Sequence, residues 1–165
     1  MPSTYEAIAT QTLGSAAASV TFSSIPGTYT DLVLVVVPAN SAGSVVRMQL
    51  NADTGSNYSN TFLKGNGSSA SSARSSSQTY LSLADDAAPT RTLGESVWIA
   101  QIMNYSNSTT NKTVLTRANV ASVGVEAVVG LWRSTAAITQ VSVQQGGSVT
   151  FSVGSTFTLY GIKAA

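Results

Sequence analysis

Residues 97–105 read Val97-Trp98-Ile99-Ala100-Gln101-Ile102-Met103-Asn104-Tyr105, with large apolar side chains at both alternating sets of positions. Successive side chains of a β-strand point to opposite faces of its sheet, so this stretch predicts a central strand that is covered on both faces. The β-branched run 32–37 has the same two-sided character. Val141 and Val143 instead alternate with polar side chains, which indicates a strand with one solvated face.

Further short segments with the composition of strands extend on both sides of this stretch. They are residues 5–10, 18–22, 45–50, 61–64, 79–83, 113–117, 127–133, 149–152 and 156–163. Turn-forming pairs such as Pro26-Gly27 and Gly146-Gly147 separate them. No window keeps the apolar spacing of an amphipathic helix. We therefore expect an all-β fold, a jelly-roll-like antiparallel β-sandwich of about ten strands with little or no helix.

The length fits one domain over residues 1–165, because a chain of 165 residues can bury roughly 70% of its unfolded surface. Two polar stretches interrupt the strand pattern, at about 51–60 and 65–78. The second stretch is Ser-rich like a linker, but strand-like sequence continues on both sides of it. We therefore expect both stretches to be polar loop excursions within the single β-sandwich domain, and loops of this kind are either mobile or ordered by an interface.

The composition excludes several classes of function. Ser and Thr make up 46 of the 165 residues, whereas the chain has 8 Lys and Arg, 7 Asp and Glu, no His and no Cys. Zinc ligands of the usual kind and disulfides are therefore not available. A net charge of +1 with scattered cations offers no basic patch for nucleic acid. No apolar run approaches the ~20 residues that cross a bilayer, so we expect neither nucleic acid nor a membrane as a partner.

The remaining reactive side chains form no convincing catalytic motif. A Ser-Lys pairing would use Lys64, Lys112 or Lys163, but 26 serines place one near any lysine by chance. Adjacent Asp85 and Asp86 would point to opposite faces of an extended segment. The oxygen ligands around Asp53 lack the EF-hand spacing, so a structural turn is expected there rather than a calcium site. We expect a protein that is not an enzyme and that binds no cofactor or metal.

Aromatic side chains supply the remaining candidates for contacts. Trp98 and Trp132 lie in apolar strand runs and are expected in the core. Tyr58 has polar neighbours and is the best candidate for an exposed aromatic that touches a partner. Three further candidates come from the second polar stretch and from the segment between the two stretches. The four candidate partner-contact residues are Tyr58, Phe62, Arg74 and Gln78.

Five motifs, at residues 12–32, 51–60, 65–72, 130–138 and 154–163, are spread over most of the length of the chain. They resemble small β-structured virion proteins of tailed bacteriophages. The resemblance implies a protein of the virion surface, either a capsid decoration (cement) protein or a tail-fibre or receptor-binding module. It supplies no catalytic residue.

Of these contexts we favour capsid decoration. A fibre subunit normally carries a helical or repetitive attachment segment, whereas domain-like sequence begins here at Tyr5 and continues to the end. We expect a homotrimer on the capsid exterior that binds the major capsid protein or other virion proteins and stabilises the assembled shell. The first alternative is a tail-fibre tip that recognises host glycans. The second is a polysaccharide depolymerase, which would need convergent carboxylates from among Asp31, Asp53, Asp85, Asp86, Glu95 and Glu126.

Overall fold

A computed structural model describes residues 4–39, 44–84 and 95–163. These residues contain strands, turns and no helix, which confirms the all-β prediction. The strands are β1 (Tyr5–Thr12), β2 (Ser19–Phe22), β3 (Asp31–Val37), β4 (Val46–Leu50), β5 (Tyr58–Gly65), β6 (Ala70–Gln78), β7 (Leu81–Ala84), β8 (Ser96–Ile102), β9 (Lys112–Val120), β10 (Gly124–Trp132), β11 (Val141–Gln145) and β12 (Thr156–Ile162). The described part of the chain has no helix long and apolar enough to cross a membrane.

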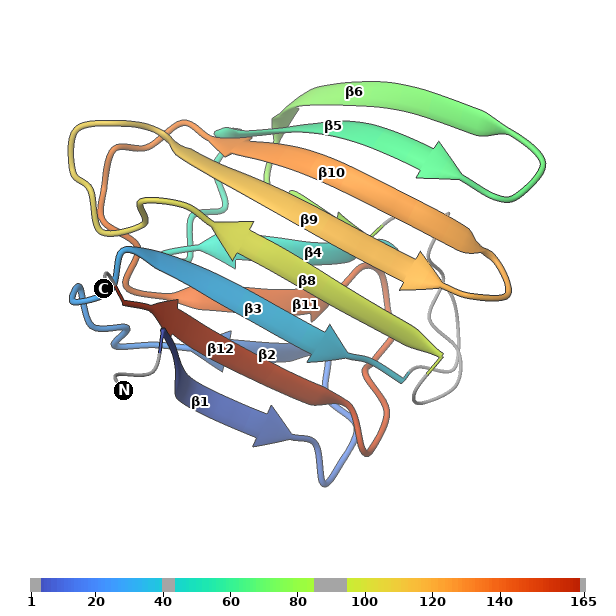
Figure 1. The fold of residues 1–165 in the computed structure, drawn as a ribbon, viewed down its shortest axis with the longest axis horizontal. Coiled ribbons are helices and arrows are strands. Elements are labelled where there is room, and N and C mark those ends of the chain that lie inside the picture. Colours follow the sequence, from blue (N-terminus) through green and yellow to red (C-terminus); the bar gives the residue numbers. More distant parts are fainter. Residues whose placement is uncertain (1–3, 40–43, 85–94, 164–165) are drawn as a thin grey trace.

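The strands form two antiparallel sheets of unequal size. The larger sheet has eight strands in the order β1-β12-β3-β8-β9-β10-β5-β6, and the smaller has four in the order β2-β11-β4-β7. In Figure 1 the larger sheet lies in front of the smaller one. This arrangement confirms the predicted β-sandwich, in which the four-stranded sheet covers one face of the eight-stranded sheet.

The core lies between the two sheets. On β8, Ser96, Trp98, Ala100 and Ile102 are buried, whereas the alternate residues are half-buried. The two tryptophans expected in the core are there, since Trp98 is 1% exposed and Trp132 is 2% exposed. β8 is central, as predicted, because it lies between β3 and β9. The prediction that this strand is covered on both faces is only half right, because among the described residues only the inner face has a covering layer.

The Ser-rich stretch 65–78 is not the polar loop that was expected. Most of it is strand β6, which pairs with β5 from Gly65↔Ala70 to Tyr58↔Gln78. The hairpin turn is closed by the Asn66 side chain, whose Oδ1 accepts the Ser68 and Ser69 amides at 3.0 and 2.8 Å. Because β6 is an edge strand with mostly exposed residues, it needs no apolar face, and its composition therefore gave no strand signal.

Two other boundaries also differ from the expectation. The stretch 51–60 is a turn only as far as Asn57, because β5 begins at Tyr58. Residues 149–152 form no strand, and only an isolated bridge joins Phe151 to Ala17. Phe151 is nevertheless fully buried, with its ring edge-on to Phe157 at 4.9 Å between centroids. The apolar alternation there reflects packing into the core rather than pairing in a sheet.

Candidate interaction surfaces

The outer face of the smaller sheet is polar. Side chains of β2, β4 and β11 alternate, with apolar residues buried in the core and polar residues on the outside. This confirms the solvated face predicted for the strand that contains Val141 and Val143. The outward residues of these three strands are Ser19, Thr21, Arg47, Gln49, Ser142 and Gln144.

The outer face of the larger sheet is polar over β1 and β12, where Thr10, Thr12, Thr156 and Thr158 face outward, and more apolar over the central strands. Alternation along β3, β8, β9, β10 and β5 places a second set of apolar side chains on this side, across strands paired in register. We call this surface the outer apolar face, and it comprises Val35, Val37, Leu63, Val97, Ile99, Leu115, Val125, Ala127, Val129 and Leu131, whereas Val33 on the same side is already buried. Three of these side chains are strongly exposed, namely Leu63 at 61%, Val125 at 58% and Val129 at 48%.

The outer side of the larger sheet carries few charges. Arg117 on β9 lies in the middle of the sheet, with Ile99 and Ala127 as its register partners on the two neighbouring strands. Asp31 is the first residue of β3, and Arg74 lies on the edge strand β6. One central cation and two peripheral charges of opposite sign leave most of this surface neutral, which keeps the desolvation cost of covering it low.

The outer apolar face is hollowed near the tip of the β5–β6 hairpin. A depression of about 320 Å³ is lined there by Leu63, Lys64, Gly65, Ala70, Val125 and Ala127. Small residues form its floor because Gly65 pairs with Ala70 on one side and with Val125 on the other. A depression of this composition can receive an apolar side chain from another molecule.

The four candidate contact residues do not form one site. Phe62 and Gln78 lie together in a second depression of about 210 Å³, which Val45, Ser75, Tyr80 and Ser82 also line. Arg74 is exposed on the other face of β6, where it pairs with Thr61. Contact of Phe62, Arg74 and Gln78 with a partner stays a prediction.

The depression around Phe62 combines aromatic rings with neutral polar groups, and a cation lies over each of the two rings. The Arg47 guanidinium lies over the Tyr80 ring at 4.5 Å, and the Lys64 ammonium lies 5.2 Å from the Phe62 ring centroid. The Gln78 amide donates to the Ser76 carbonyl at 3.0 Å. Half-buried aromatic faces beside hydroxyl and amide groups are suited to a small polar ligand that has an apolar side, as sugars do.

The expectation that Tyr58 is exposed is wrong. It is 0% exposed, and its ring stacks on Trp132 at 6.2 Å between centroids. Tyr58 begins β5 opposite Trp132 and faces the core, so only its hydroxyl reaches the polar turn. There the hydroxyl accepts a hydrogen bond from the Leu50 amide at 3.2 Å and donates one to the Asp53 carbonyl at 3.0 Å. Burial raises the pKa of Tyr58 to about 12.

The Asp53 side chain holds the turn in which it lies. The Asp53 carboxylate accepts hydrogen bonds from the Gly55 amide at 2.8 Å, the Asn57 side chain at 2.9 Å and the Trp132 indole at 2.6 Å. Burial opposes ionisation of this carboxyl, but the three donors outweigh it and lower the pKa of Asp53. Its oxygens therefore fasten the turn to β10.

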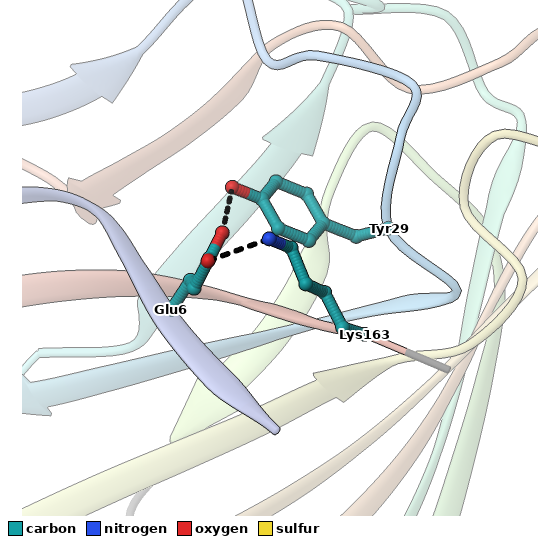
Figure 2. Close-up of polar contacts among 3 residues, drawn as sticks. All are labelled: Glu6, Tyr29 and Lys163. Carbon is teal, nitrogen blue, oxygen red and sulfur yellow. Dashed lines mark hydrogen bonds and ion pairs between the residues drawn. The ribbon is translucent and has the colours of Figure 1, made fainter. Parts of the chain in front are cut away.

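Figure 2 shows a polar cluster that joins the two ends of the described chain. Glu6 on β1 accepts the Lys163 ammonium at 2.6 Å and the Tyr29 hydroxyl at 3.1 Å. The hydrogen bonds from Lys163 and Tyr29 lower the pKa of Glu6, and the bond to Glu6 raises the pKa of Lys163. The Tyr29 ring lies against Gly161, where an added Cβ would approach within 2.3 Å of the ring. The cluster closes one end of the sandwich.

Other charged residues considered from the sequence also have local structural partners. The Lys112 side chain is buried, and its ammonium donates to the carbonyls of Thr110 and Thr135 at 2.7 and 3.1 Å. Asp31 accepts the Asn104 amide at 2.6 Å. Glu126 is buried on β10 with Lys64 as its register partner on β5. Asp85 and Asp86 lie outside the described residues.

The sequence reasoning missed two features of these surfaces. Tyr80 lines the second depression and Arg47 lies over its ring, but nothing in the sequence brings β4 close to the turn before β7. The outer apolar face, in contrast, had a signal, because runs 32–37 and 97–105 are apolar at both alternating positions. That pattern was interpreted as cover on both faces, whereas in the part of the chain that the structure describes only the inner face is covered.

Comparison with known proteins gives no relative from which a role could be transferred. No protein-family model, no curated protein and no solved structure matches the chain. The outer apolar face and the depression around Phe62 are therefore the observations from which a function can be argued.

Proposed function

We propose that this chain is a non-enzymatic structural subunit of a bacteriophage virion, and specifically a decoration (cement) protein on the capsid exterior. The single observation that carries the proposal is the outer apolar face. A lone domain in water rarely exposes a broad apolar surface, whereas a subunit of an assembly needs one. The choice of a virion as the assembly rests on the sequence motifs that resemble phage surface proteins.

The contrast between the two outer faces supports an assembly role. One face of the same sandwich follows the usual rule of polar residues toward water, so the apolar character of the other is not a general property of this sequence. The outer apolar face is close to neutral, so covering it removes few charges from water. A surface of this kind is suited to permanent contacts in a repeated assembly.

The proposed mechanism is stabilisation by binding. A subunit that binds only the assembled shell stabilises that state by its binding free energy, and no covalent step is required. The proposed partners are further copies of this chain, with a trimer as the expected unit, and the major capsid protein or other virion proteins. Neither nucleic acid nor a membrane is among the proposed partners.

Copy number in purified particles tests this proposal. Quantitative mass spectrometry of virions from the phage that encodes the chain should find it in numbers comparable with the major capsid protein. A few copies per particle would instead indicate a tail location, and absence from washed particles would contradict a virion role altogether. Heating the particles with and without the protein gives the second readout, because a cement protein should raise the temperature at which the shell opens.

The depression around Phe62 favours one second candidate, a tail-tip protein that binds host glycans. Phe62 and Tyr80 supply ring faces there, and Ser75 and Gln78 supply hydrogen-bonding groups. Titration with host surface oligosaccharides, followed by NMR, should then shift resonances at this depression, and Tyr80→Ala should abolish the shift. Thr21→Ala on the outer face of the smaller sheet is the control. Unchanged spectra for the wild type would remove this candidate.

A further inference from the structure

We infer that the outer apolar face is a self-association surface, buried in the working protein against further copies of this chain. The inference rests on the proposed assembly role and names the partner of this face. The strands β3 and β8 carry the two-sided apolar pattern of strands that are buried on both faces. Within the described residues the smaller sheet covers only one face, and we take the second layer to come from another molecule.

The size of the face fits a stable contact between proteins. The five strands that carry the outer apolar face have seven to nine residues each, and at about 4.8 Å between strands and about 3.3 Å per residue they give a face of about 600 Å². Stable interfaces bury about 800 Å² on each partner. Covering the outer apolar face with an equal surface therefore gives a contact near the lower end of the range for stable interfaces, without any further segment.

The charge pattern favours a copy of the same chain as the occupant. In a homo-oligomer the same surface patch recurs in every subunit, so a strongly charged patch would face a patch of the same charge and be repelled. Here most of the face is neutral, and the peripheral Asp31 and Arg74 are opposite in sign. The central charged residue, Arg117, is an arginine, and arginine is the one charged residue type that is enriched in protein interfaces. A strongly charged partner would find no complementary surface here.

The shape of the face also has the features of an interface. Two sheets pack face to face about 10 Å apart when their side chains interdigitate, as the two sheets of this sandwich do in its own core. The exposed Val125, Val129 and Leu63 project from the face, and the depression of about 320 Å³ beside them is lined by Gly65 and Ala70. Projecting side chains and a hollow on one surface allow one copy to fill the hollow of another.

Sedimentation velocity of the purified chain tests the inference. The wild type should sediment as a closed oligomer, and Val129→Glu should raise its dissociation constant at least about tenfold, since the new carboxylate must be desolvated in the contact. Val129 is 48% exposed in the single chain, so the variant should keep the stability of the fold. Val125→Glu is a second variant at 58% exposure, in case the first does not fold. Gln49→Glu places the same charge on the outer face of the smaller sheet and should leave the oligomer intact.

Two results would overturn the inference. One is a wild type that stays monomeric at all concentrations, and the other is an oligomer that both Val129→Glu and Val125→Glu leave unchanged. The proposed function is tested by a different measurement, which is the presence of the protein in virions. An oligomer that dissociates as expected but is absent from virions contradicts the virion role alone. A monomer that is abundant in virions contradicts self-association alone, and loss of Val129→Glu from those virions would assign the face to another virion protein.

Discussion

At the scale of single residues, several polar side chains hold the turns of the sandwich in place. Tyr58 is the clearest case, because its ring lies in the core while its hydroxyl serves the turn that follows β4. The polar neighbours in the sequence suggested exposure, and they do surround the hydroxyl. Sequence alone could not show that the ring itself pairs with Trp132 across the β5–β10 ladder.

Tyr58→Phe should lower the free energy of unfolding by about 1–3 kcal/mol at pH 8, because the buried Leu50 amide loses its acceptor. The effect of pH should also change. Unfolded tyrosine ionises near pH 10, whereas the folded pKa is about 12, so the wild type loses stability as the pH rises through this range. Urea denaturation at pH 8 and pH 11 should therefore show a smaller difference between the two proteins at pH 11.

Tyr80→Phe is the matched control, and it should cost little at either pH. The explanation for Tyr58 would be wrong if Tyr58→Phe were as stable as the wild type at pH 8. It would also be wrong if the difference between the two proteins grew at pH 11.

Gly161 is required by the close approach of the Tyr29 ring at one end of the sandwich. Gly161→Ala should cost about 1–3 kcal/mol, because the new methyl group would lie 2.3 Å from the Cγ atom of Tyr29 and the base of the ring cannot swing away. Thermal denaturation of Gly161→Ala, of Tyr29→Ala and of the double variant measures the coupling between the two sites. The same glycine change should cost much less in the Tyr29→Ala background.

Gly14→Ala is the control for the loss of a glycine, because no atom lies within 4 Å of the Cβ that it would add. Equal costs for Gly161→Ala with and without the Tyr29 ring would contradict the steric explanation.

At the scale of strands, predictability followed how much of each strand is buried. β3 and β8 were predictable because their apolar residues and β-branched content are those of central strands. β6 was not predictable, because an exposed edge strand is held by its backbone hydrogen bonds to β5 and can accept almost any side chain. The apolar residues near Phe151 were mistaken for a strand because burial in an irregular segment gives a similar short pattern.

The edge position of β6 predicts its dynamics. Its backbone pairs with β5 on one side only, whereas β8 is paired on both sides and covered by the smaller sheet. Amide hydrogen exchange of the purified protein, followed by mass spectrometry, should therefore be at least about tenfold faster in β6 than in β8. Equal protection of the two strands would mean that another chain pairs with the free edge of β6.

At the scale of the whole molecule, the sandwich has two outer faces that differ in kind. The polar face of the smaller sheet could be predicted from alternation in a single strand. The outer apolar face could be predicted only in part, because the residues indicate that both sides of β8 are covered but do not say by which molecule. The periodic pattern of apolar residues along a strand indicates which of its faces are buried in the working protein. A single chain need not supply all of the residues that bury them.

The central claim is that the outer apolar face is covered by further copies of this chain, and thiol labelling tests it most directly. The chain has no cysteine, so Val129→Cys and Ser19→Cys each introduce a single reporter, one on the outer apolar face and one on the polar face of the smaller sheet. At high protein concentration we predict that a maleimide reacts rapidly at position 19 and slowly at position 129, and that dilution brings the two rates together. Equally rapid labelling at both positions across the whole concentration range would contradict the claim.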